Sequence, residues 1–345
     1  MRNVPSSEYA ELHCLSNFSF LRGASHAEEL MVQARELGYA ALAITDECSL
    51  AGVVRAHTAV RKIGGGIKLL IGAEFTLDCG LRLVVIARNR AGYGRLSRLI
   101  TRGRRKAQKG SYSLGRADVA EFLATPSDGT LALWLPPFKG PKAEEAAEDA
   151  AAAADQGAWV ACTFAGRAWI AVEFTRDGRD RERLAHCRRL GERHALPLTA
   201  AGDVHMHVRE RRALQDALTA VRHGVTLAEA GERLFPNGER HLRTRERLAA
   251  LYPPELLAET VRIAALADFS LDELRYEYPR ELVPEGETPA SHLRKLAAAG
   301  AQRRWPAGVP PAMRDKIDYE LALIADLKYE SYFLTVHDIV SEARK

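Results

Sequence analysis

The sequence predicts an α/β fold, because short apolar segments alternate with amphipathic helical segments over residues 1–225. The apolar segments are hydrophobic along their whole length, as strands of a sheet covered on both faces are. Polar residues collect where these strands are expected to end, which is where the active sites of α/β barrels lie. The three observations together favour an α/β barrel or sheet.

Each element has its own local signal. Seven strands are expected over residues 9–15, 41–46, 67–77, 81–87, 130–135, 168–174 and 196–200. Five helices are expected between them, over residues 25–38, 51–62, 91–108, 142–155 and 178–191. Ser25 and Glu28 predict a capping box at the start of the first helix, and Gly38 its end. Asp78-Cys79-Gly80 predicts a hairpin turn. From about residue 208 helices take over, and we expect a domain change near residue 275.

The composition restricts the class of protein. Hydrophobic residues make up 47% of the chain and charged residues 27%, as in a soluble globular protein with a substantial core. The five cysteines are scattered without a C-x-x-C pair, which favours a reducing cytoplasmic compartment over a disulfide framework or a zinc ribbon. No apolar run approaches 18 residues, so we expect no membrane span. The net charge of +4 permits a nucleic-acid partner but does not require one.

Imidazoles and carboxylates at the ends of different strands are what a multinuclear metal site requires. The candidates are His13, Glu47, Glu74, Asp203 and His205. In Asp203-x-His205 the two side chains share one face of an extended segment. Taken alone, such a pair is more often joined by a loop hydrogen bond than bound to a metal.

The residues around these candidates resemble a known family. Motifs of the polymerase and histidinol phosphatase (PHP) domain resemble Glu11–Gly23, Ala43–Glu47, Gly72–Glu74 and Gly202–His205. The chain also resembles the damage-inducible, error-prone C-family DNA polymerase of the bacterial mutasome. This resemblance lies in Tyr9–Ser25, Ile44–Ala51, Gly202–Leu218 and Pro236–Leu242. The resemblance continues to residues 329–338. It implies a distorted (β/α)7 TIM-like barrel, the PHP domain, over residues 1–275, and a mainly helical start of the polymerase palm over residues 276–345.

The chain departs from the family's metal-binding pattern at several positions. The first motif has His13-Cys-Leu15 where intact PHP sites have His-x-His, and Arg22 stands where an acidic ligand usually precedes glycine. The usual Asp-His of the second motif is Asp46-Glu47. Arg82 stands where a histidine is expected, and the expected ligand after residues 131–135 has no counterpart.

These departures predict a vestigial site that binds no metal and hydrolyses nothing. The arginines Arg22 and Arg82 place fixed positive charge where a cation would bind, and we expect at least one of them to pair with a neighbouring carboxylate. Two alternatives remain open. One is a working metal-dependent PHP phosphoesterase or 3′–5′ exonuclease, and the other is a non-catalytic module that docks partner proteins.

A basic run could contact DNA phosphates without sequence preference. Its members are Arg95, Arg98, Arg102, Arg104, Arg105, Lys106 and Lys109. A solvated helix face is an equally good interpretation of such a run, although no carboxylate interrupts this one. A second basic group, Arg209, Arg211, Arg212 and Arg222 with His207, is expected to be a solvated surface.

The resemblance also implies where polymerase chemistry resides. Nucleotidyl transfer needs carboxylates that hold two Mg²⁺ ions, and in this family they lie in the palm beyond the last motif seen here. We therefore expect this chain to be an N-terminal fragment without polymerase activity of its own. The full polymerase is expected to use Mg²⁺ and to act in DNA repair and damage-induced translesion mutagenesis. Its implied partners are DNA, mutasome accessory proteins and the sliding clamp.

Overall fold

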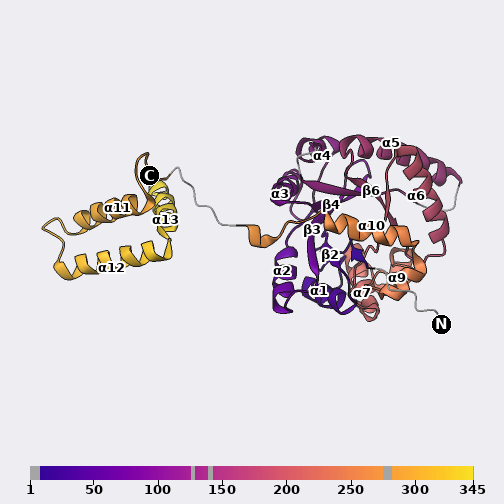
Figure 1. Ribbon diagram of the computed structural model, residues 1–345, viewed down its shortest axis with the longest axis horizontal. Helices are drawn as coiled ribbons and strands as arrows, with labels where there is room; N and C mark the ends of the chain where they lie inside the picture. The colour runs from indigo at the N-terminus through magenta and orange to yellow at the C-terminus, as the bar shows by residue number, and fades with distance from the viewer. Residues whose placement is uncertain (1–7, 126–128, 139–142, 275–281, 345) are drawn as a thin grey trace. The chain divides into compact units, whose positions relative to one another are not determined.

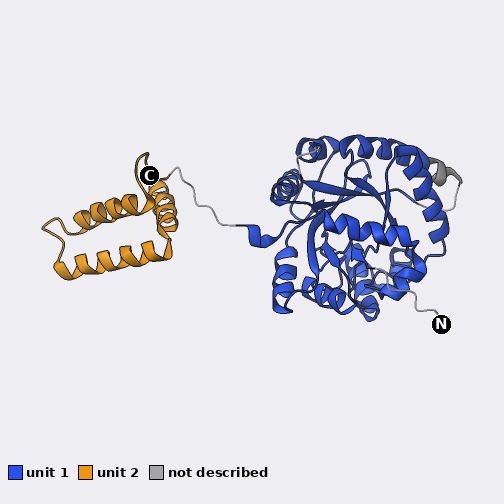
Figure 2. Ribbon diagram, viewed as in Figure 1, with its two compact units in different colours: residues 1–274 blue, residues 275–345 orange. Residues whose placement is uncertain are grey.

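The computed structural model describes residues 8–125, 129–138, 143–274 and 282–344 (Figure 1). The chain separates into two compact units, residues 1–274 and 275–345 (Figure 2). Each unit is described by itself. The domain change expected near residue 275 lies outside the described residues.

The first unit is built on one seven-stranded sheet whose strands follow each other in sequence order. The strands are β1 (Ala10–Glu11), β2 (Ala41–Ile44), β3 (Lys68–Thr76), β4 (Arg82–Ala87), β5 (Thr130–Leu135), β6 (Ala168–Glu173) and β7 (Leu198–Ala201). All neighbouring strands are parallel except β4, which is antiparallel to both β3 and β5. Because β4 runs in reverse, its first residue, Arg82, lies at the same rim as the last residues of the other strands.

Helices surround this sheet. They are α1 (Ala27–Glu36), α2 (Val53–Lys62), α3 (Arg90–Arg105), α4 (Arg116–Leu123), α5 (Ala143–Thr163), α6 (Asp180–His194), α7 (Arg212–His223), α8 (Leu227–Ala230), α9 (Arg245–Leu251) and α10 (Pro254–Ala265). The predicted capping box is wrong by one residue. The N-cap is His26, whose backbone amide donates to Glu29 at 2.8 Å, whereas the Ser25 hydroxyl contacts His207.

The sheet closes into a barrel at its rim but not along its whole length. Hydrogen bonds from Leu15 to Val204 and from Val204 to His13 join the segments that follow β1 and β7. Below them, the buried Glu11 carboxylate bridges the gap, accepting from the amides of His13 and Gly202 at 2.9 Å each. A Cβ on Gly202 would lie 2.3 Å from this carboxylate, so only glycine fits there.

Two apolar clusters support the sheet. The inner one fills the barrel with mostly Ala, Val, Leu and Ile side chains and Trp169, and Ile263, Ala264 and Ala267, in and just after the last turn of α10, complete it. The outer cluster lies between the strands and the surrounding helices and includes Leu30, Ile44 and Phe75. The predicted α/β barrel with seven strands is confirmed. Its distortion arises from β1, much shorter than the predicted 9–15 strand, and from the reversed β4.

The second unit consists of three helices in the part that is described. They are α11 (Pro289–Arg304), α12 (Pro311–Leu327) and α13 (Glu330–Ala343). Among all described residues of the chain, no helix is both long enough and apolar enough to cross a membrane.

Candidate functional site

The loop that carries Arg22 is fixed by the buried carboxylate of Asp46. Asp46 accepts hydrogen bonds from the backbone amide and hydroxyl of Ser16 and from the hydroxyl of Ser19, at 2.7–2.8 Å. Burial raises the pKa of Asp46, and these hydrogen bonds oppose that rise. Asp46 therefore holds the first loop of the barrel in place and points Arg22 towards the rim.

Glu74 lies at the centre of the rim and is 1% exposed. One guanidinium nitrogen of Arg22 is 3.1 Å from its carboxylate, one of Arg82 is 3.2 Å away, and Nε2 of His13 is 3.0 Å away. Burial alone would raise the pKa of Glu74, but these positive partners hold it well below its ordinary value. Arg22 also reaches Glu47 at 2.8 Å. At least one of the two arginines was expected to pair with a carboxylate, and both do.

His13 is held between two carboxylates. Its Nε2 contacts Glu74, and its Nδ1 lies 2.7 Å from Glu173 at the end of β6. Burial would lower the pKa of His13, but the hydrogen bonds to Glu173 and Glu74 raise it to about 9. At neutral pH the ring is therefore an imidazolium that donates from both nitrogens.

Asp203 forms the opposite side of the rim, on a backbone with φ of 45°. It pairs with the guanidinium of Arg240 and lies 3.0 Å from Nε2 of His205. Burial, and then Arg22, lower the pKa of His205 to about 3, so this ring is neutral. Burial lowers the pKa of Arg240 to about 10, which leaves it charged at neutral pH.

We call these residues the rim cluster. Its cations are Arg22, Arg82, Arg240 and protonated His13, and its anions are Glu47, Glu74, Glu173 and Asp203. Four positive charges therefore face four negative ones, and the cluster is neutral without any ion.

A metal ion does not fit these residues as they are arranged. His13, Glu173 and Asp203 bring ligand atoms within 4.8 Å of one another, which is close enough to share an ion. Ligation needs a nitrogen lone pair, however, and both nitrogens of His13 donate protons to carboxylates. An added divalent cation would also meet three guanidinium groups with no carboxylate left unpaired.

Sequence reasoning missed two members of the rim cluster, Glu173 and Arg240. Glu173 ends β6, so the rule that polar residues at strand ends face the rim could have found it. Arg240 lies far beyond the last strand, and its backbone carbonyl accepts from the amides of His205 and Met206. The similarity of Pro236–Leu242 to the family was the signal available for it.

The basic run on α3 is partly neutralised by carboxylates from outside the run. Arg102 and Lys106 pair with Asp118 and Glu121 of α4. Arg104 points inward and donates to the backbone carbonyls of Glu47 and Cys48. The sequence showed no carboxylate within the run because its partners come from the next helix.

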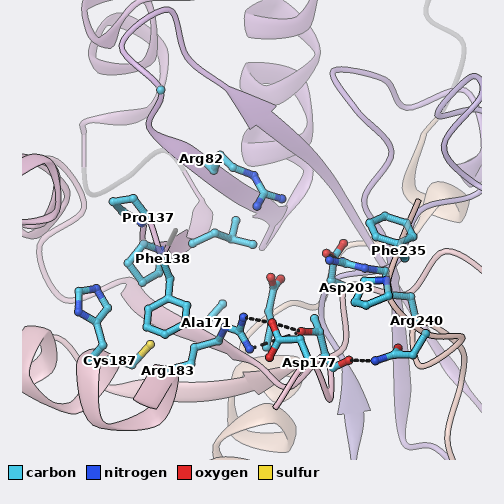
Figure 3. Close-up of a pocket in the computed structure, with 18 residues that line it drawn as sticks. Arg82, Pro137, Phe138, Ala171, Asp177, Arg183, Cys187, Asp203, Phe235 and Arg240 are labelled. Atoms are coloured by element: carbon cyan, nitrogen blue, oxygen red, sulfur yellow. Dashed lines mark hydrogen bonds and ion pairs between the residues drawn. The ribbon is translucent and has the colours of Figure 1, made fainter. Parts of the chain in front are cut away.

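A cavity of about 380 Å³ adjoins the rim cluster (Figure 3). Arg82, Asp203 and Arg240 of the cluster line it together with Phe138 and Phe235. Arg240 stacks over the ring of Phe235, 4.1 Å from its centre.

Two family models match parts of this chain. The model of the PHP domain matches residues 11–165, and that of the "Bacterial DNA polymerase III alpha NTPase domain" matches residues 291–345. Among solved structures, a protein described as a metal-dependent phosphoesterase from Bifidobacterium adolescentis is 18% identical, with a TM-score of 0.36 over 57% of this chain and 88% of that one. An amidohydrolase from Chromobacterium violaceum is also 18% identical, with a TM-score of 0.38 over 57% and 87%.

The first unit is thus a PHP-domain barrel. An error-prone DNA polymerase of Dechloromonas aromatica is 57% identical over 340 residues, which are 98% of this chain and 32% of that protein. One of Methylococcus capsulatus is 54% identical, over 97% of this chain and 30% of that protein. The chain belongs to the error-prone DNA polymerase family and spans about a third of the length of the curated relatives it matches.

The ion pairs of Arg22 predict a large loss of stability on its removal. Arg22→Ala would leave Glu47 and Glu74 without this partner in a mostly buried site, at a cost on the order of 3–5 kcal/mol. Urea unfolding followed by circular dichroism measures this loss in the free energy of unfolding. Arg55→Ala is the matched control, because Arg55 pairs with Glu28 on an exposed surface, where about 0–1 kcal/mol is expected. Equal losses in the two variants would contradict the assignment.

The raised pKa of His13 predicts a stability that depends on pH. Its contribution is fully present below about pH 6.5, the unfolded pKa, and is lost as the pH rises through about 9. The loss amounts to about 3 kcal/mol, since one pKa unit corresponds to about 1.4 kcal/mol. Unfolding free energies of wild type and His13→Gln, compared between pH 6.5 and 9.5, should show this decline in wild type alone. An NMR titration that found His13 neutral at pH 7 would contradict it.

Proposed function

We propose that this chain is part of an error-prone DNA-directed DNA polymerase and that its PHP barrel is structural rather than hydrolytic. The observation that carries the proposal is the neutral rim cluster, in which both nitrogens of His13 are engaged by carboxylates. Arginine forks satisfy the oxygens of Glu74 that a metal ion would otherwise bridge. The barrel then needs no metal to keep its carboxylates together.

A metal-dependent phosphoesterase or exonuclease is the competing function. It would need ions that generate a hydroxide nucleophile and polarise a phosphate. No described side chain at the rim offers an unpaired carboxylate for this purpose. The similarity to phosphoesterases is one of fold, so it does not favour this reading.

Metal analysis distinguishes the two functions. After dialysis, inductively coupled plasma spectrometry of the chain should find well under one Zn²⁺, Mn²⁺ or Fe ion per molecule, and EDTA should leave the melting temperature unchanged. The reason is the absence of a free ligand lone pair on His13. One or more ions per chain, lost together in a Glu74→Gln variant, would establish a metal site and end the structural proposal.

We further propose that α3 contributes to non-specific DNA binding. Arg98, Arg105 and Lys109 are exposed and have no ion-pair partner among the described residues. A cavity of about 510 Å³ is lined by Arg98 and Arg105 together with Phe122, and Lys109 lies in the segment that follows α3. Cations of this kind neutralise phosphates without reading bases. Arg102, Arg104 and Lys106 are not part of this surface. Arg102 and Lys106 already pair with carboxylates of α4, and Arg104 donates to backbone carbonyls.

Charge reversal tests this surface. Changing Arg98, Arg105 and Lys109 to Glu should weaken binding of a fluorescent duplex at least tenfold, as measured by anisotropy at low salt. The wild-type affinity should also fall steeply as salt rises, through counterion release. The matched control reverses the exposed Arg181, Arg189 and Arg193 of α6. If both triple variants bind equally, α3 is not the DNA surface.

The remaining functions belong to the whole polymerase. The proposal includes Mg²⁺-dependent nucleotidyl transfer by further parts of the protein, a cytoplasmic location, and a role in damage-induced translesion synthesis. It also includes mutasome accessory proteins and the sliding clamp as partners. The second unit, residues 275–345, would begin the palm, which is supported by the family model that matches residues 291–345.

A further inference from the structure

We propose that the cavity between α3 and α4 binds an unpaired base of single-stranded DNA. The two helices pack on each other on the outside of the barrel (Figure 1), and the cavity has a volume of about 510 Å³. None of its lining residues belongs to the rim cluster. The inference rests on the proposed contribution of α3 to DNA binding, and it names the form of DNA that this surface takes.

One face of α3 provides most of the lining. Arg98, Thr101, Arg102 and Arg105 line the cavity, and their spacing of three, four and seven residues places them on one side of the helix. The opposite side of α3 is buried against the barrel. Arg98 and Arg105 lie roughly 10 Å apart along the helix axis, at 1.5 Å per residue. Both are exposed, so they can contact the backbone of a strand at two points.

The helix α4 adds an aromatic ring to this cavity. Phe122 is half-buried and lines the cavity beside the arginines. The guanidinium of Arg102 lies over its ring, 5.1 Å from the ring centre. Unpaired bases stack on aromatic rings and on guanidinium planes, and every base has a face that can do so. We call Phe122 and Arg102 the stacking pair.

Arg102 is held in position by Glu121. Its two terminal nitrogens donate to the two carboxylate oxygens of Glu121, at 3.2 and 3.0 Å. Hydrogen bonds of such a fork lie in the plane of the guanidinium, so they do not cover its faces. The same pairing neutralises Glu121, which would otherwise repel a phosphate beside the cavity. Arg102 therefore supplies a fixed flat group, while Arg98 and Arg105 supply the free charge.

The stacking pair favours a single strand over a duplex. In a duplex each base is stacked between its neighbours and paired, so only phosphates can reach the helix. A base that is already unpaired leaves its stack at a smaller cost. The volume of the cavity lies within the range of about 300–1,000 Å³ that small-molecule sites have, so one base can enter it. Stacking does not depend on base identity, so the binding stays non-specific.

Fluorescence anisotropy with two DNA probes tests the cavity. The probes are a labelled oligothymidylate and a duplex of equal length, at the same low salt concentration. Phe122→Leu should weaken binding of the single strand at least fivefold, because the ring contact is lost, and should change duplex binding less than twofold. Phe122→Tyr keeps the ring and should retain the wild-type affinity within twofold. The matched control, Phe20→Leu, removes a ring that is 82% exposed elsewhere and should change neither affinity.

A change in the probe gives the same answer without a variant. A single strand of abasic residues keeps the phosphates and lacks the bases, so wild type should bind it at least fivefold more weakly than oligothymidylate. Phe122→Leu should bind these two strands alike. If the abasic strand binds as well as oligothymidylate and Phe122→Leu binds like wild type, the cavity takes no base. In that case the triple charge reversal of α3 still decides whether the helix binds DNA, and its failure to weaken either probe would overturn both proposals.

Discussion

The rim of the barrel depends on how the charge of Glu74 is balanced. A carboxylate that is 1% exposed loses the stabilisation that water gives it, and an unpaired buried charge costs several kcal/mol. Glu74 regains that energy from two guanidinium groups and one imidazolium, all within 3.0–3.2 Å. The partners come from three separate parts of the chain. Arg22 is delivered by a loop fixed on Asp46, Arg82 by the reversed strand β4, and His13 by the end of β1.

This arrangement changes what the barrel requires from its surroundings. A carboxylate cluster held by a metal is stable only while the metal is bound, since ion binding and folding are linked. In a cluster held by arginines, the positive charges that balance the carboxylates are side chains of the protein itself, so no bound ion is required. The cost is chemical, because guanidinium groups cannot activate water as a metal ion can. In the structural role proposed above, arginines at these positions would give the barrel a stability that is independent of metal supply.

The sequence predicted the parts of this structure that follow from periodicity. Apolar strands alternating with helices identified the barrel, and the rule about strand ends located His13, Glu74 and Asp203. Long-range contacts were less accessible. Glu173 matched the same rule without being recognised, and Arg240 reaches the rim from a loop that follows α7 and α8. The start of α1 shifted by one residue because Ser25 binds His207, a contact 182 positions away in sequence.

The basic runs show most clearly why the remaining contacts could not be predicted from the sequence. Whether a basic residue is available to a ligand depends on carboxylates that the fold brings next to it, not on its neighbours in the chain. Arg102 belongs to an uninterrupted basic run, yet α4 supplies Asp118 and Glu121 as its partners. Arg222 belongs to a group expected to be a solvated surface, and its companions Arg211 and Arg212 are indeed paired with Glu29 and Asp216. Arg222 alone of that group lines a cavity of about 350 Å³ at the rim, and every carboxylate in the lining of this cavity is already engaged by another cation. Its charge is therefore available to an anionic ligand, and only the completed barrel makes it so.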